Sequence, residues 1–155
     1  MTTIDITIRA AIPTDTQAMT DLTYRSKQSV GYDDDLMRYF RQNLIITPDR
    51  LTQLCFWVAE VGEAMVGCGA MEPIDKTTAE VRYFFIAPAS KGRGIGRALW
   101  YELRSTAQSQ GLTQVAVRAD SAAQPFFQSV GFKAQGEAFS RHLPGKMVSY
   151  MVCDI

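Results

Sequence analysis

The residues best suited to bind an anion form one short loop, Lys91-Gly92-Arg93-Gly94-Ile95-Gly96-Arg97. The loop follows an apolar run that ends at Pro88, and a helical pattern follows the loop. Glycines let backbone N–H groups converge on a ligand without clashes from Cβ atoms, and a helix N-terminus adds partial positive charge. Three basic side chains add full charges. This pattern predicts a pyrophosphate site, and an ordinary glycine-rich surface turn is the alternative.

Two common phosphate-binding motifs do not fit this loop. A Walker A loop ends in Gly-Lys-Ser/Thr, whereas Gly96 is followed by Arg97 and Ala98, so no hydroxyl group is placed to hold Mg²⁺. The dinucleotide motif GxGxxG, started at Gly92 and Gly94, would need a third glycine where the chain has Arg97. A nucleotide triphosphatase and a dinucleotide-dependent enzyme are therefore poorly supported.

The cysteines and the histidine do not form a metal motif. Cys55, Cys68 and Cys153 are widely spaced and include no CxxC pair, and His142 is the one histidine of the chain. We expect reduced, mostly buried thiols, as in a cytosolic protein, and no metal site.

Alternating strands and helices must position the loop. Period-2 alternation and short apolar runs predict strands at 4–11, 55–60, from 64 onward, 77–87, 113–119, 132–139 and 146–155. Helical spacing predicts helices at 14–29, 32–45, 94–111 and 121–130. Thr14 or Asp15 is expected to cap the first helix, whose apolar stripe comprises Ala18, Met19, Leu22 and Tyr24. This order predicts an α/β (α+β) protein with a mixed sheet and helices on both faces.

Composition limits the classes of partner. The chain has 155 residues, 46% of them hydrophobic, which predicts a single domain with a proper core. Sixteen basic and 16 acidic residues balance, so we expect no nucleic acid and no anionic membrane as a partner. No apolar run reaches the roughly 18 residues of a membrane-spanning helix, and the N-terminus does not read as a signal peptide. We expect a cytoplasmic protein.

Two segments together resemble the GNAT superfamily of N-acetyltransferases. The segment FFIAPASKGRGIGRALW is similar to the family's acyl-CoA-binding signature, a strand ending near Val-x-Pro, then Gln/Arg-x-x-Gly-x-Gly/Ala and a helix. Lys91 stands where Gln or Arg is usual. The segment DSAAQPFFQSVGF is similar to the family's Asn-x-x-Ala-x-x-Phe-Tyr-x-x-x-Gly-Phe. The resemblance covers essentially the whole chain, and implies a single N-acetyltransferase domain at 1–155 and a mostly antiparallel central sheet whose fourth and fifth strands splay apart.

The resemblance implies acetyl-CoA as the acyl donor, with no metal. The loop would hold its pyrophosphate, and the end of the fourth strand would pair with its pantetheine arm through backbone groups. A backbone N–H near Phe84 would polarise the thioester carbonyl. The residues implied for acetyl-CoA are Phe84, Phe85, Ile86, Lys91, Gly92, Arg93, Gly94, Ile95, Gly96, Arg97, Asp120 and Phe127.

Acetyl transfer to an amine requires a group that accepts a proton, because the amine is mostly protonated at neutral pH. We expect Glu80 to be this base, as in family members with a glutamate at the matching position. It lies about a dozen ångströms along the strand from Phe84, so a water relay is expected. An ordinary solvent-facing carboxylate is the alternative. Phe127 replaces the family's tyrosine and has no proton to give, so the thiolate leaves unassisted or takes a proton from elsewhere. Asp120 replaces the family's asparagine and could cap the following helix.

The acceptor would be framed by the first two helices and by the loop between the last two strands. Tyr24, Tyr32 and the acidic run 33–35 would favour a cationic amine, although such a run is usually a capped helix start. Arg141 and His142 would instead suit an acceptor with a carboxylate. These two indications oppose each other, so the sequence leaves the acceptor open.

We therefore expect an enzyme that transfers an acetyl group from acetyl-CoA directly to the amine of a small molecule or peptide. The alternative is a non-catalytic acyl-CoA-binding or sensor module on the same fold, which Phe127 keeps open. A homodimer is also left open, because the apolar last strand could pair with a second copy or complete the core of its own chain.

Overall fold

The computed structural model describes residues 5–155, and the chain in it divides into two compact units. One unit extends to Ala70 and includes Tyr83–Leu103, and the other comprises Met71–Arg82 and Arg104–Ile155. Seven strands follow the order β1-β2-β3-β4-β5-β7-β6, and β3, β4 and the long helix α4 each run from one unit into the other. None of the helices described is both long enough and apolar enough to cross a membrane.

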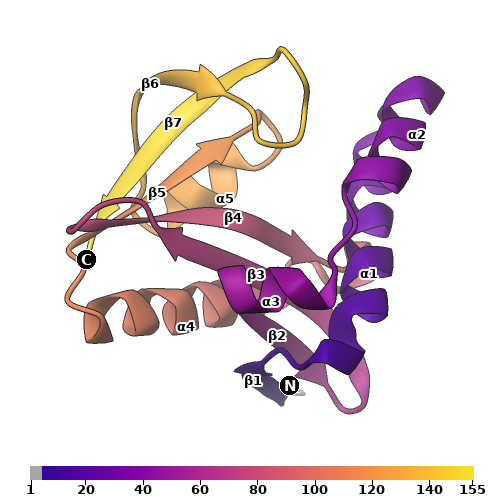
Figure 1. The fold of residues 1–155 in the computed structure, drawn as a ribbon, viewed down its shortest axis with the longest axis horizontal. Helices are drawn as coiled ribbons and strands as arrows, with labels where there is room; N and C mark the ends of the chain where they lie inside the picture. Colours follow the sequence, from indigo (N-terminus) through magenta and orange to yellow (C-terminus); the bar gives the residue numbers. More distant parts are fainter. Residues whose placement is uncertain (1–4) are drawn as a thin grey trace. The chain divides into compact units, whose positions relative to one another are not determined.

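The first unit contains the N-terminal strands and helices (Figure 1). Its elements are β1 (Ile6–Ala10), η1 (Pro13–Asp15), α1 (Thr16–Val30), α2 (Asp34–Asn43), α3 (Pro48–Gln53), β2 (Cys55–Val61), most of β3 (Ala64–Pro73), the end of β4 (Thr78–Ile86), η2 (Pro88–Ser90) and most of α4 (Ile95–Ser109). β1 pairs antiparallel with β2, and the β2–β3 hairpin turns at Gly62, as predicted. Ile4, which the sequence assigns to the first strand, lies outside the described residues.

Two sequence expectations for this unit are wrong, and one element was missed. Neither Thr14 nor Asp15 caps α1 with its side chain, because the Asp15 carboxylate instead accepts hydrogen bonds from Arg9 and from the Ile12 N–H. Ala18 is exposed rather than part of the buried stripe, whereas Met19 and Leu22 are fully buried. The six-residue helix α3 begins at Pro48, directly after Thr47, and was not predicted.

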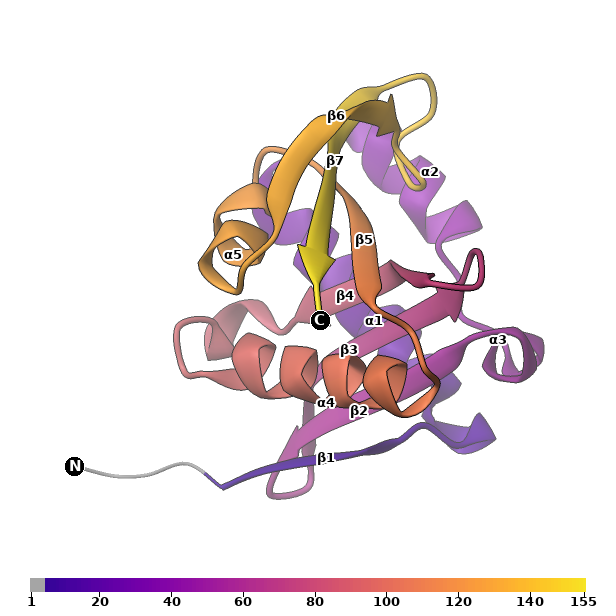
Figure 2. The ribbon, with the colours of Figure 1, turned by 90° about the vertical axis from the view of Figure 1, so that its left-hand side faces the viewer.

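The second unit is built around one parallel and two antiparallel strand pairs (Figure 2). Its elements are the start of β4, the end of α4, β5 (Gln114–Ala119), α5 (Gln124–Ser129), β6 (Lys133–Phe139) and β7 (Met147–Asp154). The parallel pairing of β4 with β5 runs from Thr78–Gln114 to Val81–Val117, and β4 continues as a strand to Ile86. The pairing thus covers only the first part of β4, in line with the expected splaying of this pair.

The last strand of the chain, β7, pairs only with strands of its own unit in the described residues. It pairs with β5 on one side and with β6 on the other, so both of its edges are used within the chain. The last strand therefore completes this unit, which is one of the two interpretations that the sequence left open. Cys68 and Cys153 are buried and Cys55 is half-buried, and all three are free thiols, as predicted.

Candidate functional site

The glycine-rich loop has a backbone that only glycines adopt easily. Gly92 has φ +78° and Gly94 has φ +84°, both in the left-handed region, and a Cβ built at either would meet nothing within 4 Å. α4 starts at Ile95, and its first bond runs from the Ala98 N–H to the Gly94 carbonyl at 3.0 Å. Within the described chain, the N–H groups of residues 92–97 donate to no backbone carbonyl.

The same loop fits a pyrophosphate. Proteins bind phosphate groups with features that this loop has: open space at its glycines, backbone N–H groups that donate to no backbone carbonyl, and the start of a 15-residue helix. Lys91, Arg93 and Arg97 are all exposed and add three positive charges, whereas Ile95 is 1% exposed and anchors the helix start in the core. The residues predicted for the phosphates are thus brought together in one unit.

The end of β4 uses its side chains for packing. A Cβ built at Gly69 would lie 3.3 Å from the Phe84 ring, and one at Gly67 would lie 3.0 Å from Ile86 Cδ1. Phe85 alternates with these two residues and lies near the Tyr83 ring, with ring centroids 6.5 Å apart. Because all three side chains make packing contacts inside the unit, the backbone of residues 84–86 is the part that we expect to bind a ligand.

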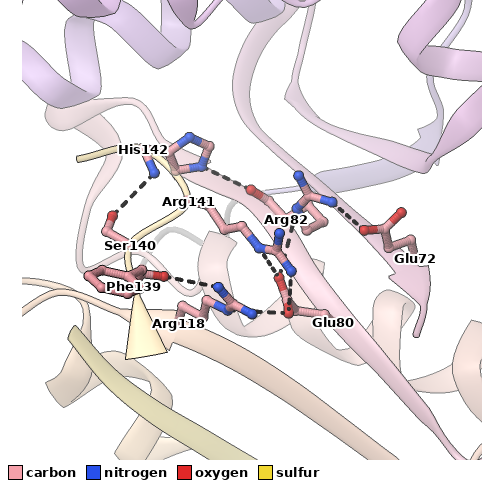
Figure 3. Close-up of polar contacts among 8 residues, drawn as sticks. All are labelled: Glu72, Glu80, Arg82, Arg118, Phe139, Ser140, Arg141 and His142. Atoms are coloured by element: carbon pink, nitrogen blue, oxygen red, sulfur yellow. Dashed lines mark hydrogen bonds and ion pairs between the residues drawn. The ribbon is translucent and has the colours of Figure 1, made fainter. Parts of the chain in front are cut away.

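Glu80, the predicted base, lies at the centre of an arginine cluster in the second unit (Figure 3). Its side chain is 1% exposed, so the alternative of an ordinary solvent-facing carboxylate is wrong. Arg141 donates to both carboxylate oxygens, at 2.8 and 3.0 Å. Arg118 Nε lies 3.6 Å and Arg82 Nε 3.8 Å from the carboxylate. The hydrogen bonds that Arg141 donates to Glu80 raise the pKa of Arg141 above its ordinary value, so this guanidinium stays charged.

The cluster holds the loop between β6 and β7 against β4. Arg141 lies in this loop, and its neighbour His142 is hydrogen-bonded through Nε2 to the Arg82 carbonyl oxygen at 3.0 Å (Figure 3). A carbonyl oxygen only accepts, so Nε2 carries the proton. Ser140 Oγ accepts from the N–H groups of His142 and Leu143. Two side-chain contacts to β4 and one capping hydroxyl thus fix the conformation of residues 140–143.

Arg82 and Arg118, the other two arginines of the cluster, each make a further hydrogen bond. Arg82 donates to Glu72 on β3, and Arg118 Nη1 on β5 donates to the Phe139 carbonyl at 3.0 Å. The Nε atoms of Arg82 and Arg118 are buried and have no hydrogen-bond partner. Neither residue was predicted from the sequence as a site residue. A signal was present, because Glu80 sits between apolar residues of a strand expected to be buried, and a buried carboxylate requires cationic partners.

The residues of the second motif are structural in this unit. Phe127 is 4% exposed, and its ring packs edge-on against Phe126 and Phe132, with centroids 5.3 and 5.1 Å away. Asp120 Oδ1 accepts from the Ala123 N–H at 3.0 Å, so its carboxylate organises the turn that leads into α5. Their predicted contacts with acetyl-CoA stay predictions.

The predicted acceptor residues of the first unit lie on α1 and just before α2. Tyr24 accepts a hydrogen bond from Arg41 at 2.8 Å, and the Arg41 guanidinium also stacks over the Tyr24 ring. Tyr32 packs edge-on against Phe40, and the Lys27 ammonium group lies 5.7 Å from the Tyr32 ring centroid. Lys27, which was not predicted from the sequence as a site residue, is 7% exposed, and its ammonium group lies 5.1 to 5.7 Å from three aromatic ring centroids.

A family comparison agrees with this geometry. The model of the acetyltransferase (GNAT) domain matches residues 38–143, which include the loop, Glu80 and Arg141. The chain belongs to the GNAT acetyltransferase family. N-acetyltransferase family 8 member 3 from Rattus norvegicus is 31% identical to this GNAT chain over 107 residues, which are 64% of the chain and 47% of the relative. The chain thus spans about half the length of the curated relatives it matches.

Solved structures share the fold of this GNAT chain. A GCN5-related N-acetyltransferase from Rhodopseudomonas palustris superposes with a TM-score of 0.81 at 18% identity, covering 100% of the chain and 98% of that structure. The PaiA N-acetyltransferase from Thermoplasma acidophilum, solved in complex with coenzyme A, also gives 0.81 at 15% identity, covering 98% and 100%. The mixed, mostly antiparallel sheet that the family resemblance implies is confirmed, and in the described residues β4 and β5 form its parallel pair.

Proposed function

We propose that this GNAT chain transfers an acetyl group from acetyl-CoA to the amine of a bound acceptor by direct attack. The observation that carries the proposal is the loop at residues 91–97. It has two glycines in the left-handed region, backbone N–H groups that donate to no backbone carbonyl, and three exposed basic residues. Family membership and a relative of the same fold in complex with coenzyme A support the same ligand. Acetyl-CoA would supply the activated acyl group as a thioester.

The chain's own residues would divide the work as follows. Backbone N–H groups of residues 92–97, with Lys91, Arg93 and Arg97, would bind the pyrophosphate, and the backbone of residues 84–86 would bind the pantetheine arm. A backbone N–H near Phe84 would stabilise the oxyanion of the tetrahedral intermediate. Phenylalanine at position 127 donates no proton, so we propose that the thiolate leaves without a general acid, as its ordinary pKa near 8.5 allows.

Glu80 is proposed as the group that accepts the proton of the amine. In support, its carboxylate is buried on β4, beside a loop that the family resemblance assigns to the acceptor site. Both of its oxygens accept hydrogen bonds from Arg141, so a proton would reach Glu80 through a bridging water or after Arg141 has moved. A Glu80→Gln variant should lose more kcat/KM near neutral pH than at high pH, where the amine is already deprotonated. An unchanged rate and pH profile would remove Glu80 as the base.

A turnover screen tests the function itself. Acetyl-CoA-dependent release of free thiol would be measured with polyamines, amino acids, aminoglycosides and peptide N-termini. The proposal predicts amine-dependent thiol release with at least one class. Binding of acetyl-CoA without turnover on any amine would instead favour the non-catalytic acyl-CoA module. The action of residues 1–155 as one N-acetyltransferase domain and a cytoplasmic location are further predictions.

A further inference from the structure

One guanidinium of the Glu80 cluster has no carboxylate of its own. Arg141 occupies both oxygens of Glu80, and Arg82 donates to Glu72. Within residues 5–155, Glu80 is the only carboxylate within 4 Å of Arg118, and its oxygen lies 3.6 Å from Nε, beyond a good hydrogen bond. The cluster therefore combines three guanidinium groups with two carboxylates, which leaves one surplus positive charge.

Arg118 is also poorly satisfied as a hydrogen-bond donor. A guanidinium carries five N–H groups. For Arg118, Nη1 donates to the neutral Phe139 carbonyl at 3.0 Å, whereas Nε is buried without a partner. The side chain is 27% exposed, so solvent reaches only part of it. A partly buried cation in this state is stabilised by an anion that brings both charge and hydrogen-bond acceptors.

The competing indication of a cationic acceptor weakens in the structure. The acidic run at residues 33–35 was part of its basis, together with Tyr24 and Tyr32. Asp33 accepts from the Leu36 N–H at 2.8 Å and caps α2, and Asp35 accepts from Arg38 at 3.2 Å. These two carboxylates are therefore used by the helix itself. Arg118 and Arg141, by contrast, present positive charge beside the loop that the family resemblance assigns to the acceptor.

We infer that the acceptor is an amino acid and that Arg118 binds its carboxylate; this inference rests on the proposed acetyl transfer. The carboxylate of the acceptor would neutralise the surplus charge of the cluster. Arginine suits this role because its planar guanidinium matches the two oxygens of a carboxylate. Glu80 has a positioning role here, because it holds Arg141, and with it the loop at residues 140–143, next to Arg118.

The test uses binding, so that it does not depend on turnover. The full chain is saturated with CoA and titrated with N-acetyl amino acids, the products of the inferred reaction, and with their carboxamides, which differ only in the charged group. Titrations followed by NMR would read weak affinities. At least one acid should bind roughly 10- to 100-fold more tightly than its amide, as expected for charge-assisted hydrogen bonds.

Three variants locate the effect. Arg118→Gln should abolish the difference between acid and amide, and Arg118→Lys should retain part of it because the charge remains. Arg38→Gln, which removes the same charge from a side chain that is 66% exposed on α2, should leave the difference unchanged. A urea titration confirms that each variant is folded.

Two results would overturn the inference: equal binding of every acid and its amide, including no binding by either, or an unchanged preference in folded Arg118→Gln. The same samples separate this failure from that of the proposed function. Tight CoA binding without tighter binding of the acids than of their amides would contradict only the inferred carboxylate site. Absence of CoA binding would contradict the proposed acetyl transfer and therefore also the inference that rests on it.

Discussion

Replacement of Glu80 by glutamine tests how the structure balances its buried charges. The substitution keeps the shape of the side chain and removes its charge, leaving Arg141, Arg118 and Arg82 around a neutral amide. Glutamine still offers one acceptor oxygen to Arg141, but its NH₂ group faces donors where Glu80 presents an oxygen at 2.8 or 3.0 Å. The folded state therefore loses one charge-assisted hydrogen bond and gains repulsion among cations.

The size of the effect follows from the burial of the partners. Removing one member of a fully buried ion pair costs roughly 3–5 kcal/mol. Here the carboxylate is 1% exposed, but the side chain of Arg141 is 33% exposed, so water hydrates part of the unpaired guanidinium. We expect a loss of about 2–3 kcal/mol in the free energy of unfolding, which lowers Tm by roughly 4–12 °C in a chain of this length.

The assay is urea unfolding followed by tryptophan fluorescence and circular dichroism. Glu137→Gln is the matched control, because it makes the same chemical change at an exposed position of β6, and its effect should stay within about 0.5 kcal/mol. A Glu80→Gln variant as stable as the wild type would refute the reasoning, because it would show that the carboxylate is not needed to hold the three arginines together.

Three further predictions concern other parts of the chain. Arg9 and the Ile12 N–H hold the pKa of Asp15 below its ordinary value, so the Asp15 carboxylate stabilises the fold at pH values above its unfolded pKa. The difference in free energy of unfolding between wild type and Asp15→Asn should therefore be constant above about pH 5 and shrink as the pH falls below about 4, and a difference independent of pH would contradict this. Burial raises the pKa of Cys68 to about 12, so a thiol reagent at pH 8 should modify half-buried Cys55 and leave Cys68 unmodified in the folded protein, as read by mass spectrometry; equal labelling would count against this burial. Gly67→Ala should cost about 1–3 kcal/mol in urea unfolding, because the new Cβ would lie 3.0 Å from Ile86 Cδ1 and 3.3 Å from the Phe85 carbonyl oxygen, and a neutral effect would show that β4 shifts easily.

The order of strands and helices was largely predictable because its signals are local. The turn at Gly62, the stop of α4 at Gly111 and the closure of α5 at Gly131 each combine a glycine with an end of periodicity, and all three glycines have positive φ. Helix α3 was missed because six residues are too few to show a helical period. The capping role assigned to Asp15 was wrong because Arg9, six residues earlier on β1, binds the carboxylate instead.

The candidate site was predictable only in part. The loop at residues 91–97 can be recognised from its composition, because its glycines and basic residues are adjacent in the chain. The cluster around Glu80 cannot be recognised in this way, because Glu72, Arg118 and Arg141 come from three other segments, and only strand pairing brings them near Glu80. A sequence shows that Glu80 is flanked by apolar residues, but it does not show how many cations reach it or which of them lacks a partner.

The most direct test of the central claim is the affinity for acetyl-CoA of wild type, Gly94→Val and Gly62→Val, measured by isothermal titration calorimetry. Both glycines have positive φ and open surroundings, so both substitutions introduce similar backbone strain, of the order of 1–2 kcal/mol, but only Gly94 lies in the proposed pyrophosphate loop. The account predicts that Gly62→Val binds acetyl-CoA like the wild type and that Gly94→Val binds at least tenfold more weakly. Equal affinities of a folded Gly94→Val variant and the wild type would contradict it.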